Sequence, residues 1–228
     1  MQDDIRKAIE VLKQGGIILY PTDTIWGIGC DATNEEAVKK VYELKQRHDS
    51  KSMLVLIDNP ANLQAYVREV PDIAWDLIDL SDKPLTIIYD GAKNLAPNLI
   101  APDGSIGIRV TDELFSNALC RQFRRPIVST SANISGDSPP LRFSHVKPEI
   151  KNGVDYIVSY RQKEKEEARP SGIVKLAKDG TIHVIRKQII MVIKGLSLIF
   201  ARRDNYLTTL DANKKATQSV FPMARHPH

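Results

Sequence analysis

The 228-residue chain has few cysteines, histidines and aromatic side chains. Its 2 cysteines, Cys30 and Cys120, are far apart and form no C-x-x-C pair, so neither a disulfide framework nor a zinc site is expected. This cysteine usage favours a reducing, cytoplasmic location. The 5 histidines have no partner at a spacing typical of catalysis, and aromatic residues make up only 6% of the chain, which argues against a general RNA-binding surface.

Long apolar segments are absent as well. The longest, residues 189–200, is interrupted by Lys194, Gly195 and Ser197 and is too short to span a bilayer. The N-terminus reads Met-Gln-Asp-Asp-Ile-Arg-Lys with no apolar stretch behind its charges, so no signal peptide is expected. We therefore expect a protein with no membrane partner.

Most of the chain also lacks an excess of either charge. The formal net charge is +4, and residues 188–228, with 6 basic against 2 acidic residues, carry all of it. A basic surface on residues 1–187 must therefore be local. The motifs of serine hydrolases, zinc peptidases, P-loop proteins and dinucleotide-binding folds are missing, so these common enzyme classes are excluded.

Helical and extended patterns alternate along residues 1–187. Apolar residues recur at helical spacing over residues 5–12, and Thr33 with Glu36 matches a capping box for a helix over residues 34–45. Further helices are expected at residues 61–67, 73–80 and 113–123, and strands at residues 17–20, 26–30, 53–57, 85–89, 106–110, 127–130, 156–159, 173–176 and 181–185. The order predicts one α/β domain. The mixed-charge run 161–169 predicts a solvated, mobile loop.

Four polar clusters next to predicted strands could carry chemistry: residues 21–24, residues 45–47 with Lys51, residues 105–109 and residues 129–133. A lysine and an arginine two residues apart suit phosphate oxygens. Taken alone, the basic cluster is also explained by solvated charges at a helix C-terminus, and the serine-rich cluster by turn chemistry. Asp23 is the nearest candidate for a general base, but capping of the turn explains it equally well.

In their order along the chain, these clusters resemble the threonylcarbamoyl-AMP synthase family, which is built on the YrdC-type domain. The resemblance covers residues 5–187. It is carried by the stretch Gly-Gly-Ile-Ile-Leu-Tyr-Pro-Thr-Asp-Thr-Ile-Trp-Gly-Ile-Gly-Cys-Asp-Ala from residue 15, the K-x-R motif Lys45-Gln46-Arg47, the stretch Lys83-Pro84-Leu85-Thr86 and the S-x-N motif Ser131-Ala132-Asn133. It implies an α/β fold with a twisted, open mixed sheet flanked by helices and a concave basic cavity. Residues 1–187 would be the YrdC-like catalytic domain, and residues 188–228 an apolar segment and basic tail of unknown role.

The resemblance also implies an activity. Members of the family use ATP to join L-threonine and bicarbonate, which gives threonylcarbamoyl-AMP and pyrophosphate. A partner transferase then moves the threonylcarbamoyl group to tRNA, where it forms t6A beside the anticodon. Such an enzyme is a nucleotidyltransferase, and Mg²⁺ would enter with ATP, held mostly by the triphosphate. Attack of a carbamate oxygen on the α-phosphorus needs positive charge around the phosphates, because it brings anions together.

Carried over motif by motif, the resemblance assigns roles to individual residues. Lys45 and Arg47 would be catalytic. ATP would contact Arg47, Lys51, Ser105, Ser131, Asn133 and Arg186. L-threonine would contact Thr24, Arg109, Ser129 and Ser171, with the Arg109 guanidinium gripping both carboxylate oxygens. No residue is assigned to a metal.

Three departures from the family pattern bear on the site. His48 stands where proline is common, and Arg109 is followed by a segment that places Asp112 and Glu113 near a site for anions. Ser171-Gly172-Ile173 stands where S-T-I or S-T-V is common, which removes one hydroxyl. These differences leave open a non-catalytic YrdC-like paralogue that binds double-stranded RNA or tRNA. A different carbamoyl-adenylating activity, like that of hydrogenase-maturation proteins, is a third reading, but the sequence lacks the cysteines and the length for their extra segments. The tail 188–228 could pack on the body, bind a partner or touch tRNA.

Overall fold

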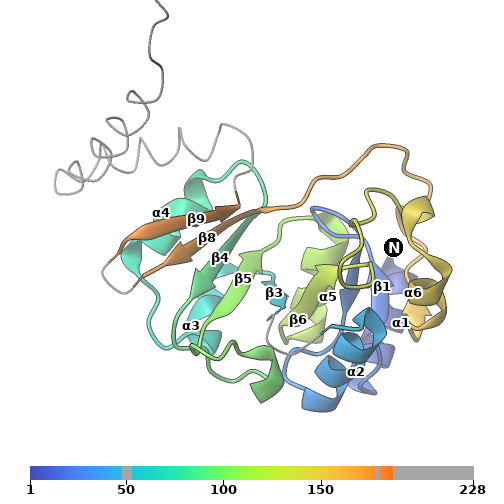
Figure 1. Ribbon diagram of the computed structural model, residues 1–228, viewed down its shortest axis with the longest axis horizontal. Helices are drawn as coiled ribbons and strands as arrows, with labels where there is room; N and C mark the ends of the chain where they lie inside the picture. The colour runs from blue at the N-terminus through green and yellow to red at the C-terminus, as the bar shows by residue number, and fades with distance from the viewer. Residues whose placement is uncertain (48–52, 178–179, 187–228) are drawn as a thin grey trace, which may run out of the picture.

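The computed structural model describes residues 1–47, 53–177 and 180–186 (Figure 1). The predicted tail, residues 188–228, lies outside the described residues. The helices are α1 (Gln2–Lys13), α2 (Glu35–Lys45), α3 (Leu63–Tyr66), α4 (Asp72–Leu80), α5 (Leu114–Phe123) and α6 (Pro148–Asn152). The strands are β1 (Ile18–Tyr20), β2 (Gly27–Gly29), β3 (Leu54–Ile57), β4 (Leu85–Tyr89), β5 (Ile106–Val110), β6 (Ile127–Ser131), β7 (Tyr156–Ile157), β8 (Gly172–Leu176) and β9 (Ile182–Arg186).

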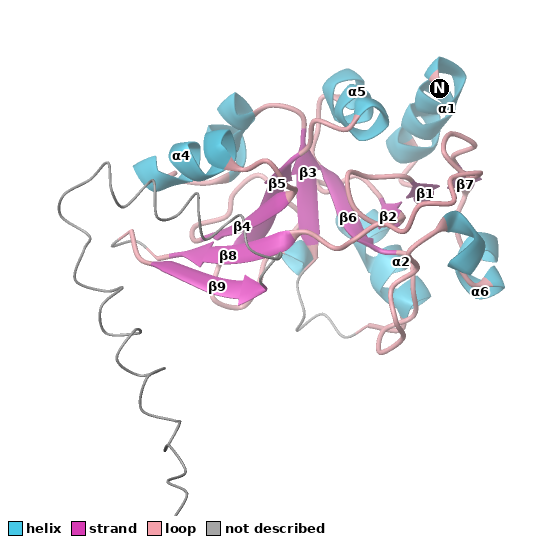
Figure 2. Cartoon of the chain, turned by 90° about the horizontal axis from the view of Figure 1, so that it is seen from above, coloured by secondary structure: helices cyan, strands magenta, loops and turns pink. Residues whose placement is uncertain are grey.

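The strands form one mixed sheet in the order β7-β1-β2-β6-β3-β5-β4-β8-β9. Three pairs are parallel (β1 with β7, β3 with β5, β4 with β8), the other five are antiparallel, and the two edge strands do not meet. Figure 2 shows the twisted sheet in the middle of the molecule, with α1, α4 and α5 along one side and α2 and α6 along the other. The α/β prediction with an open sheet flanked by helices is confirmed.

Two buried clusters hold the helices on the sheet. α1 and α5 pack together in one cluster, which contains Leu12 and Phe115 together with Leu56 of β3 and Ile127 of β6. α2, α3 and α4 bury their apolar residues in the larger cluster, which also contains the inner residues of β4, β5 and β8. Complete burial of a side chain such as Phe115 contributes about 1.5–3 kcal/mol, so these contacts account for much of the stability of the fold.

The strand register shows which part of one sheet face is not covered by a helix. Leu56 pairs with Ile127 and Arg109, and in the next row Leu54 pairs with Ser129 and Gly107. Residues paired in register point to the same face of a sheet. α5 covers Leu56 and Ile127, whereas the row of Leu54, Gly107 and Ser129 becomes part of a cavity floor.

The N-terminus of α2 differs from its prediction. The helix is capped by Asn34, whose side chain accepts a hydrogen bond from the Ala37 backbone N–H at 3.1 Å. Thr33 does not act as the cap, because its hydroxyl donates to Asp31 Oδ1 at 2.7 Å. The capping box of Thr33 and Glu36 is therefore wrong by one residue, although the helix itself was predicted over nearly the same range.

Within the described ranges, no helix has both the length and the apolar character needed to cross a membrane.

Candidate active site

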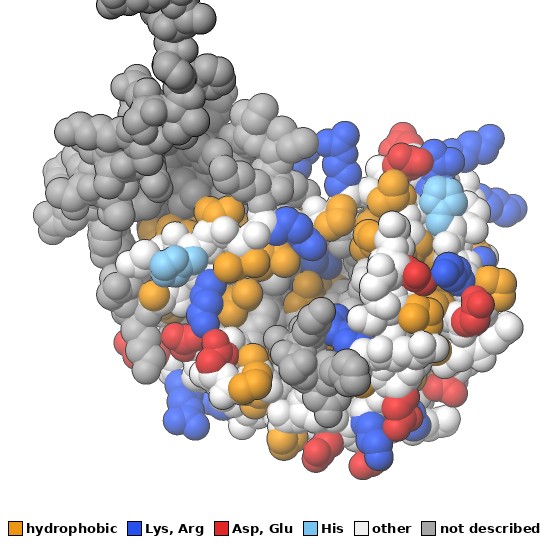
Figure 3. All heavy atoms as spheres, viewed as in Figure 1, with side chains coloured by type: hydrophobic (Ala, Val, Ile, Leu, Met, Phe, Trp, Pro, Cys, Tyr) orange, Lys and Arg blue, Asp and Glu red, His pale blue; other side chains and the backbone are white. Residues whose placement is uncertain are grey.

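A cavity of about 450 Å³ opens over Leu54, Gly107 and Ser129. The space-filling view shows a hollow in this face, with Lys and Arg side chains around it (Figure 3). Its floor is made of small residues, and a Cβ on Gly107 would lie 3.3 Å from the Leu54 Cβ and 3.4 Å from the Thr86 Cγ2. Glycine in the middle of β5 therefore keeps the floor low enough for a ligand.

The hydrogen bonds of the turn after β1 determine whether Thr24 meets the cavity as a donor or as an acceptor. Thr22 Oγ1 donates to the Ile25 carbonyl at 2.8 Å and accepts from the Thr24 backbone N–H at 3.0 Å. Because this hydroxyl has only one proton, Thr24 must be the donor in the 2.9 Å contact between the two hydroxyls. Thr24 Oγ1 also accepts from Arg109 Nη2 at 3.3 Å, so a ligand in the cavity meets Thr24 as an acceptor.

Arg109 is held from behind by a buried carboxylate. Its Nη2 lies 2.9 Å from Asp23 Oδ1, and the two side chains are 3% and 6% exposed. Burial raises the pKa of Asp23, against the opposing effect of Arg109. The Nε of Arg109 has no hydrogen-bond partner among the described residues. A buried guanidinium that lines a cavity and keeps an N–H unpaired is suited to an anionic ligand.

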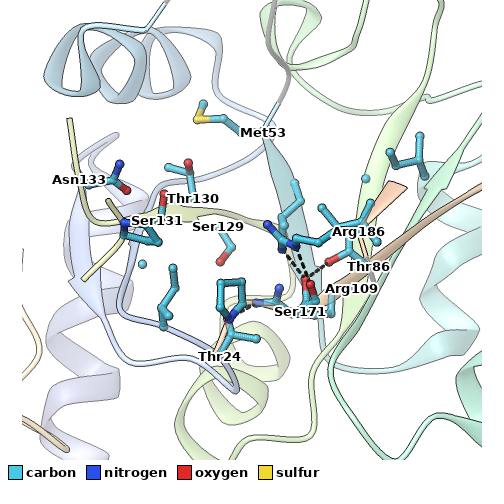
Figure 4. A pocket seen from close by; sticks show the side chains of 18 of the residues that line it. Thr24, Met53, Thr86, Arg109, Ser129, Thr130, Ser131, Asn133, Ser171 and Arg186 are labelled. Atoms are coloured by element: carbon cyan, nitrogen blue, oxygen red, sulfur yellow. Dashed lines mark hydrogen bonds between the residues drawn. The ribbon is translucent and has the colours of Figure 1, made fainter. Parts of the chain in front are cut away.

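Ser171 connects the same region to β4 and β9. Its hydroxyl lies 2.9 Å from Thr86 Oγ1 and accepts from Arg186 Nη2 at 3.3 Å, and its carbonyl accepts from Arg186 Nε at 2.8 Å. Burial, and then the charge of Arg109, lower the pKa of Arg186. Figure 4 shows Thr24, Arg109, Ser171 and Arg186 together on one side of the cavity. Thr24, Arg109 and Ser171 are called the amino-acid end below, and Arg186 lies beside them.

Ser131 and Asn133 lie on the opposite side of the cavity (Figure 4). Arg47, two residues beyond the last residue of α2, lines the cavity with them. Burial lowers the pKa of Arg47. This group is called the phosphate end below. The lining contains the three arginines 47, 109 and 186 and, among its described residues, one carboxylate, Asp137.

Lys45 lies behind the wall of the phosphate end. Its side chain is buried, and its ammonium donates to the backbone carbonyls of Ser131 and Asn133. The Lys45 carbonyl accepts from the Ser135 N–H at 2.8 Å, so the end of α2 and the loop after β6 are joined three times. Burial, and then the charge of Arg47, lower the pKa of Lys45 to about 7.

Most of the residues assigned to the site from the sequence come together in this cavity. The lining includes Thr24, Arg47, Ser105, Arg109, Ser129, Ser131, Asn133, Ser171 and Arg186. Lys45 does not line it, and Lys51 lies outside the described residues. Asp112 and Glu113 are close enough to raise the pKa of Asp23, after the larger effect of its burial, but neither lines the cavity. The contacts that each residue makes with ATP or threonine stay predictions.

Sequence reasoning missed the support of Ser105. Its hydroxyl donates to Asp103 Oδ1 at 2.5 Å, and Lys175 donates to Asp103 Oδ2 at 2.7 Å. The Asp103 pKa is lowered to about 2, mainly by the hydrogen bond from Lys175. The pattern Asp-x-Ser could have indicated this contact, because an aspartate often accepts from the residue two positions on. The lysine belongs to β8, and no local sequence pattern predicts its contact with Asp103.

The donor set does not resemble a metal centre. In the part of the chain that the structure describes, no group of three or more His, Cys, Asp and Glu side chains could hold a metal ion. Asp137 on the cavity wall accepts a hydrogen bond from Lys147 at 2.8 Å. The described lining is therefore suited to bind anionic oxygens rather than a bare cation.

Several known proteins are similar to this chain. Threonylcarbamoyl-AMP synthase of Pseudoalteromonas translucida is 35% identical over 160 residues, which cover 69% of this chain and 86% of the relative. P. abyssi Sua5, solved in complex with L-threonine, matches with a TM-score of 0.67 at 25% identity, over 75% of this chain and 50% of that one. This chain thus spans about half the length of Sua5.

The fold has a further counterpart in E. coli YciO, with a TM-score of 0.72 at 24% identity, over 83% of this chain and 91% of that one. At this identity the likeness concerns the fold alone. The family model described as "Telomere recombination" (Sua5_yciO_yrdC) matches residues 10–188, which include every described residue of the cavity. The match confirms the resemblance found in the sequence: the chain belongs to the Sua5/YciO/YrdC family.

Proposed function

We propose that this chain is an L-threonylcarbamoyladenylate synthase, a nucleotidyltransferase. It would make threonylcarbamoyl-AMP and pyrophosphate from L-threonine, bicarbonate and ATP, for a transferase that modifies tRNA. The name of the P. translucida relative and the threonine complex of Sua5 support this assignment. The observation that carries it is Arg109, a guanidinium that is 3% exposed, lines the cavity and keeps its Nε without a described partner.

The amino-acid end suits the two charged groups of threonine. The Arg109 guanidinium binds the α-carboxylate, since it is held in place by the ion pair with Asp23 and the hydrogen bond to Thr24. Thr24, whose own proton is used by Thr22, accepts from the amino group. Ser129 and Ser171 supply further hydroxyls on the same wall. The amino acid would thus be oriented at both ends before it reacts.

The phosphate end supplies charge and neutral donors for ATP. Arg47 lines the cavity with Ser131 and Asn133, which add polar groups, and Arg186, beside the amino-acid end, adds a second guanidinium for the phosphates. Lys51, outside the described residues, would add a further cation. Asp137 is already paired with Lys147, so Mg²⁺ would be held mostly by the triphosphate itself.

The chemistry is then one of positioning and charge. After the ammonium of threonine has lost its proton to water, the neutral amine forms a bond to the carbon of bicarbonate with loss of water. An oxygen of the resulting carbamate then attacks the α-phosphorus. The bond from this phosphorus to the bridging oxygen breaks, and pyrophosphate takes the electron pair. Arg47 and Arg186 stabilise the charge that develops on the phosphates. A carbamate is already an anion, so this step needs no general base, and Asp23 keeps its role as the partner of Arg109.

A paralogue that binds RNA without chemistry is supported less. Arg109 and Asp23 are almost completely buried, where the backbone of an RNA helix would not reach them. A cytoplasmic location fits the proposed role in tRNA modification. The described cysteines, Cys30 and Cys120, are both free and buried, which is consistent with a reducing compartment.

Pyrophosphate release tests the proposal. The purified full chain is incubated with ATP, Mg²⁺ and bicarbonate, together with L-threonine, L-serine or no amino acid, and the products are examined by mass spectrometry. We expect release that depends on threonine and bicarbonate, with threonylcarbamoyl-AMP as the second product. Release that is independent of threonine, or no release from folded protein, would contradict the assignment.

A further inference from the structure

The connection between β7 and β8, residues 158–171, is held in place from its first residues to its last. The mixed charges of residues 161–169 predicted a solvated, mobile loop, and this prediction is wrong for Arg161, whose side chain is only 25% exposed. Arg161 has a left-handed backbone conformation, with φ of 67°. At the other end of the connection, Pro170 and Ser171 line the cavity.

The Arg161 guanidinium contacts two distant segments of the chain and a further residue of its own connection. Its Nη1 donates to the Thr22 carbonyl at 3.0 Å and lies 3.2 Å from Glu113 Oε1. Its Nε donates to Glu164 Oε1 at 2.6 Å. One planar group therefore fixes three acceptors at once, which a lysine ammonium does with less geometric definition.

Each of these segments presents one residue of the amino-acid end. Thr22 shares its turn with Thr24, to which it is hydrogen-bonded. Glu113 caps α5 through the Ser116 N–H and follows Arg109 by four positions. Glu164 lies in the connection that leads to Ser171.

We propose that Arg161 is a positioning residue, which fixes Thr24, Arg109 and Ser171 relative to one another and thereby sets the affinity for the amino-acid substrate. The identity of that substrate as threonine rests on the proposed function. Arg161 does not line the large cavity. It borders a small pocket on the other side of the turn, together with Thr22 and Thr24.

Electrostatics supports the same role. Burial raises the pKa of Asp23, and so do, to a smaller extent, the nearby carboxylates of Asp112 and Glu113. Arg161 neutralises Glu113 through their ion pair. Without Arg161, the uncompensated charge on Glu113 would favour protonation of Asp23, and Arg109 would lose its ionised partner.

The connection also offers a matched control. Arg142 borders the same small pocket and forms an ion pair with Glu167 at 3.0 Å, again on the β7–β8 connection. Among the described residues, Arg142 forms no hydrogen bond or ion pair with Thr22 or Glu113, and it contacts the connection at Glu167, beyond Glu164. The variants Arg161→Ala and Arg142→Ala each remove one guanidinium from the same pocket, but only the first frees the three segments from one another.

Threonine binding is the first measurement. Calorimetry on the purified full chain should show a dissociation constant at least tenfold higher for Arg161→Ala and less than twofold changed for Arg142→Ala. Arg161→Lys keeps the positive charge and serves as a control for misfolding of the alanine variant. It should recover only part of the threonine affinity. The KM for ATP should stay within twofold in all three variants. Equal losses for threonine and ATP, or unchanged threonine affinity in Arg161→Ala, would overturn the proposal.

Amide hydrogen exchange of the unliganded protein is the second measurement, and it does not depend on the proposed function. Arg161→Ala should accelerate exchange in residues 21–25, 112–117 and 159–171 together, whereas Arg142→Ala should change only residues 138–142 and 165–169. Acceleration confined to the β7–β8 connection in both variants would refute the positioning role. If the wild-type chain fails to bind threonine while the exchange pattern is as expected, the substrate assignment is wrong and the positioning role stands.

Discussion

The two ends of the cavity are built in different ways. At the amino-acid end, side chains contact other side chains: Arg109 is ion-paired with Asp23 and hydrogen-bonded to Thr24, and Ser171 is hydrogen-bonded to Thr86 and Arg186. At the phosphate end, Lys45 holds backbone carbonyls of the loop after β6, and Arg47 follows the end of α2. The first end is organised by side-chain contacts between strands, and the second by anchoring two loops to each other.

The difference matches the demands of the proposed ligands. An amino acid is small and is recognised by the direction of a few hydrogen bonds, so a fixed arrangement of partners favours specificity. A triphosphate is large and strongly charged, and it is bound mainly by surrounding positive charge. At the amino-acid end Arg109 is balanced by Asp23, whereas the buried Lys45 is held by carbonyl dipoles.

The largest effect is expected when the amino-acid end loses its guanidinium. Arg109→Lys keeps a positive charge opposite Asp23 but removes the planar group that can hold both oxygens of a carboxylate. We expect the dissociation constant for threonine to rise about 100-fold, or about 2.7 kcal/mol, with ATP affinity changed about twofold at most. Isothermal titration with each ligand measures both values.

A matched substitution elsewhere provides the control. Arg125 pairs at 2.7 Å with Asp31, a side chain that is 3% exposed, and neither residue lines the cavity. Arg125→Lys should leave threonine binding unchanged. If it weakens threonine as much as Arg109→Lys does, the loss reflects general damage to the fold, and the two ends of the cavity are not independent.

The second effect concerns the buried lysine of the phosphate end. The pKa of Lys45 is about 7 in the folded chain, against 10.5 for an ordinary lysine. Between pH 7 and about 10.5 the unfolded chain binds more protons at Lys45 than the folded chain does. The contribution of Lys45 to the free energy of unfolding therefore increases with pH over this range and is lost as the pH drops towards 7. Between pH 7 and 9 the gain from this group is at most about 2 kcal/mol. Urea unfolding at both pH values should show the gain in the wild type and lose it in Lys45→Met.

Lys45→Met also tests the separation of the two ends. A neutral Lys45 amine still has two N–H groups for the carbonyls of Ser131 and Asn133, whereas methionine has none. We expect the KM for ATP to rise about tenfold, because the loop that carries Ser131 and Asn133 loosens, while threonine affinity changes less than about twofold. A rise in both constants would show that the phosphate end is not a separate unit.

A smaller effect is expected at the support of Ser105. Asp103→Asn leaves an oxygen that can accept from Ser105 but places an amide against Lys175, so the serine is held less firmly. The KM for ATP should rise by a factor of about three to five. Asp90→Asn is the control, because Asp90 lies 3.7 Å from the same lysine, whereas the described hydroxyl contact of Ser105 is with Asp103. Equal changes in the two variants would assign the effect to Lys175 rather than to Ser105.

Sequence reasoning located the strands and the cavity residues, but it could not predict how those residues are held. The β-branched runs and the family motifs are local, so β1, β5 and β6 and most of the lining follow from them. Lys45 was expected to contact phosphate. Its burial depends on carbonyls of a loop that starts 86 positions later, and no local pattern encodes that contact. The contacts of Arg161 with Thr22 and Glu113 are of the same kind, since charge composition alone predicted exposure.

The smallest effect is expected for the Mg²⁺ requirement of the phosphate end. Asp137 is the one carboxylate among the described lining residues, and it is paired with Lys147 at 2.8 Å on a partly exposed surface. If Mg²⁺ is held by the triphosphate, Asp137→Asn should change the Mg²⁺ concentration needed for half-maximal pyrophosphate release by less than about twofold. Lys147→Met, which frees the same carboxylate, should have an equally small effect. A tenfold higher Mg²⁺ requirement in Asp137→Asn alone would make Asp137 a metal ligand, and the phosphate end would then bind its nucleotide through a protein-held cation as well as through arginines.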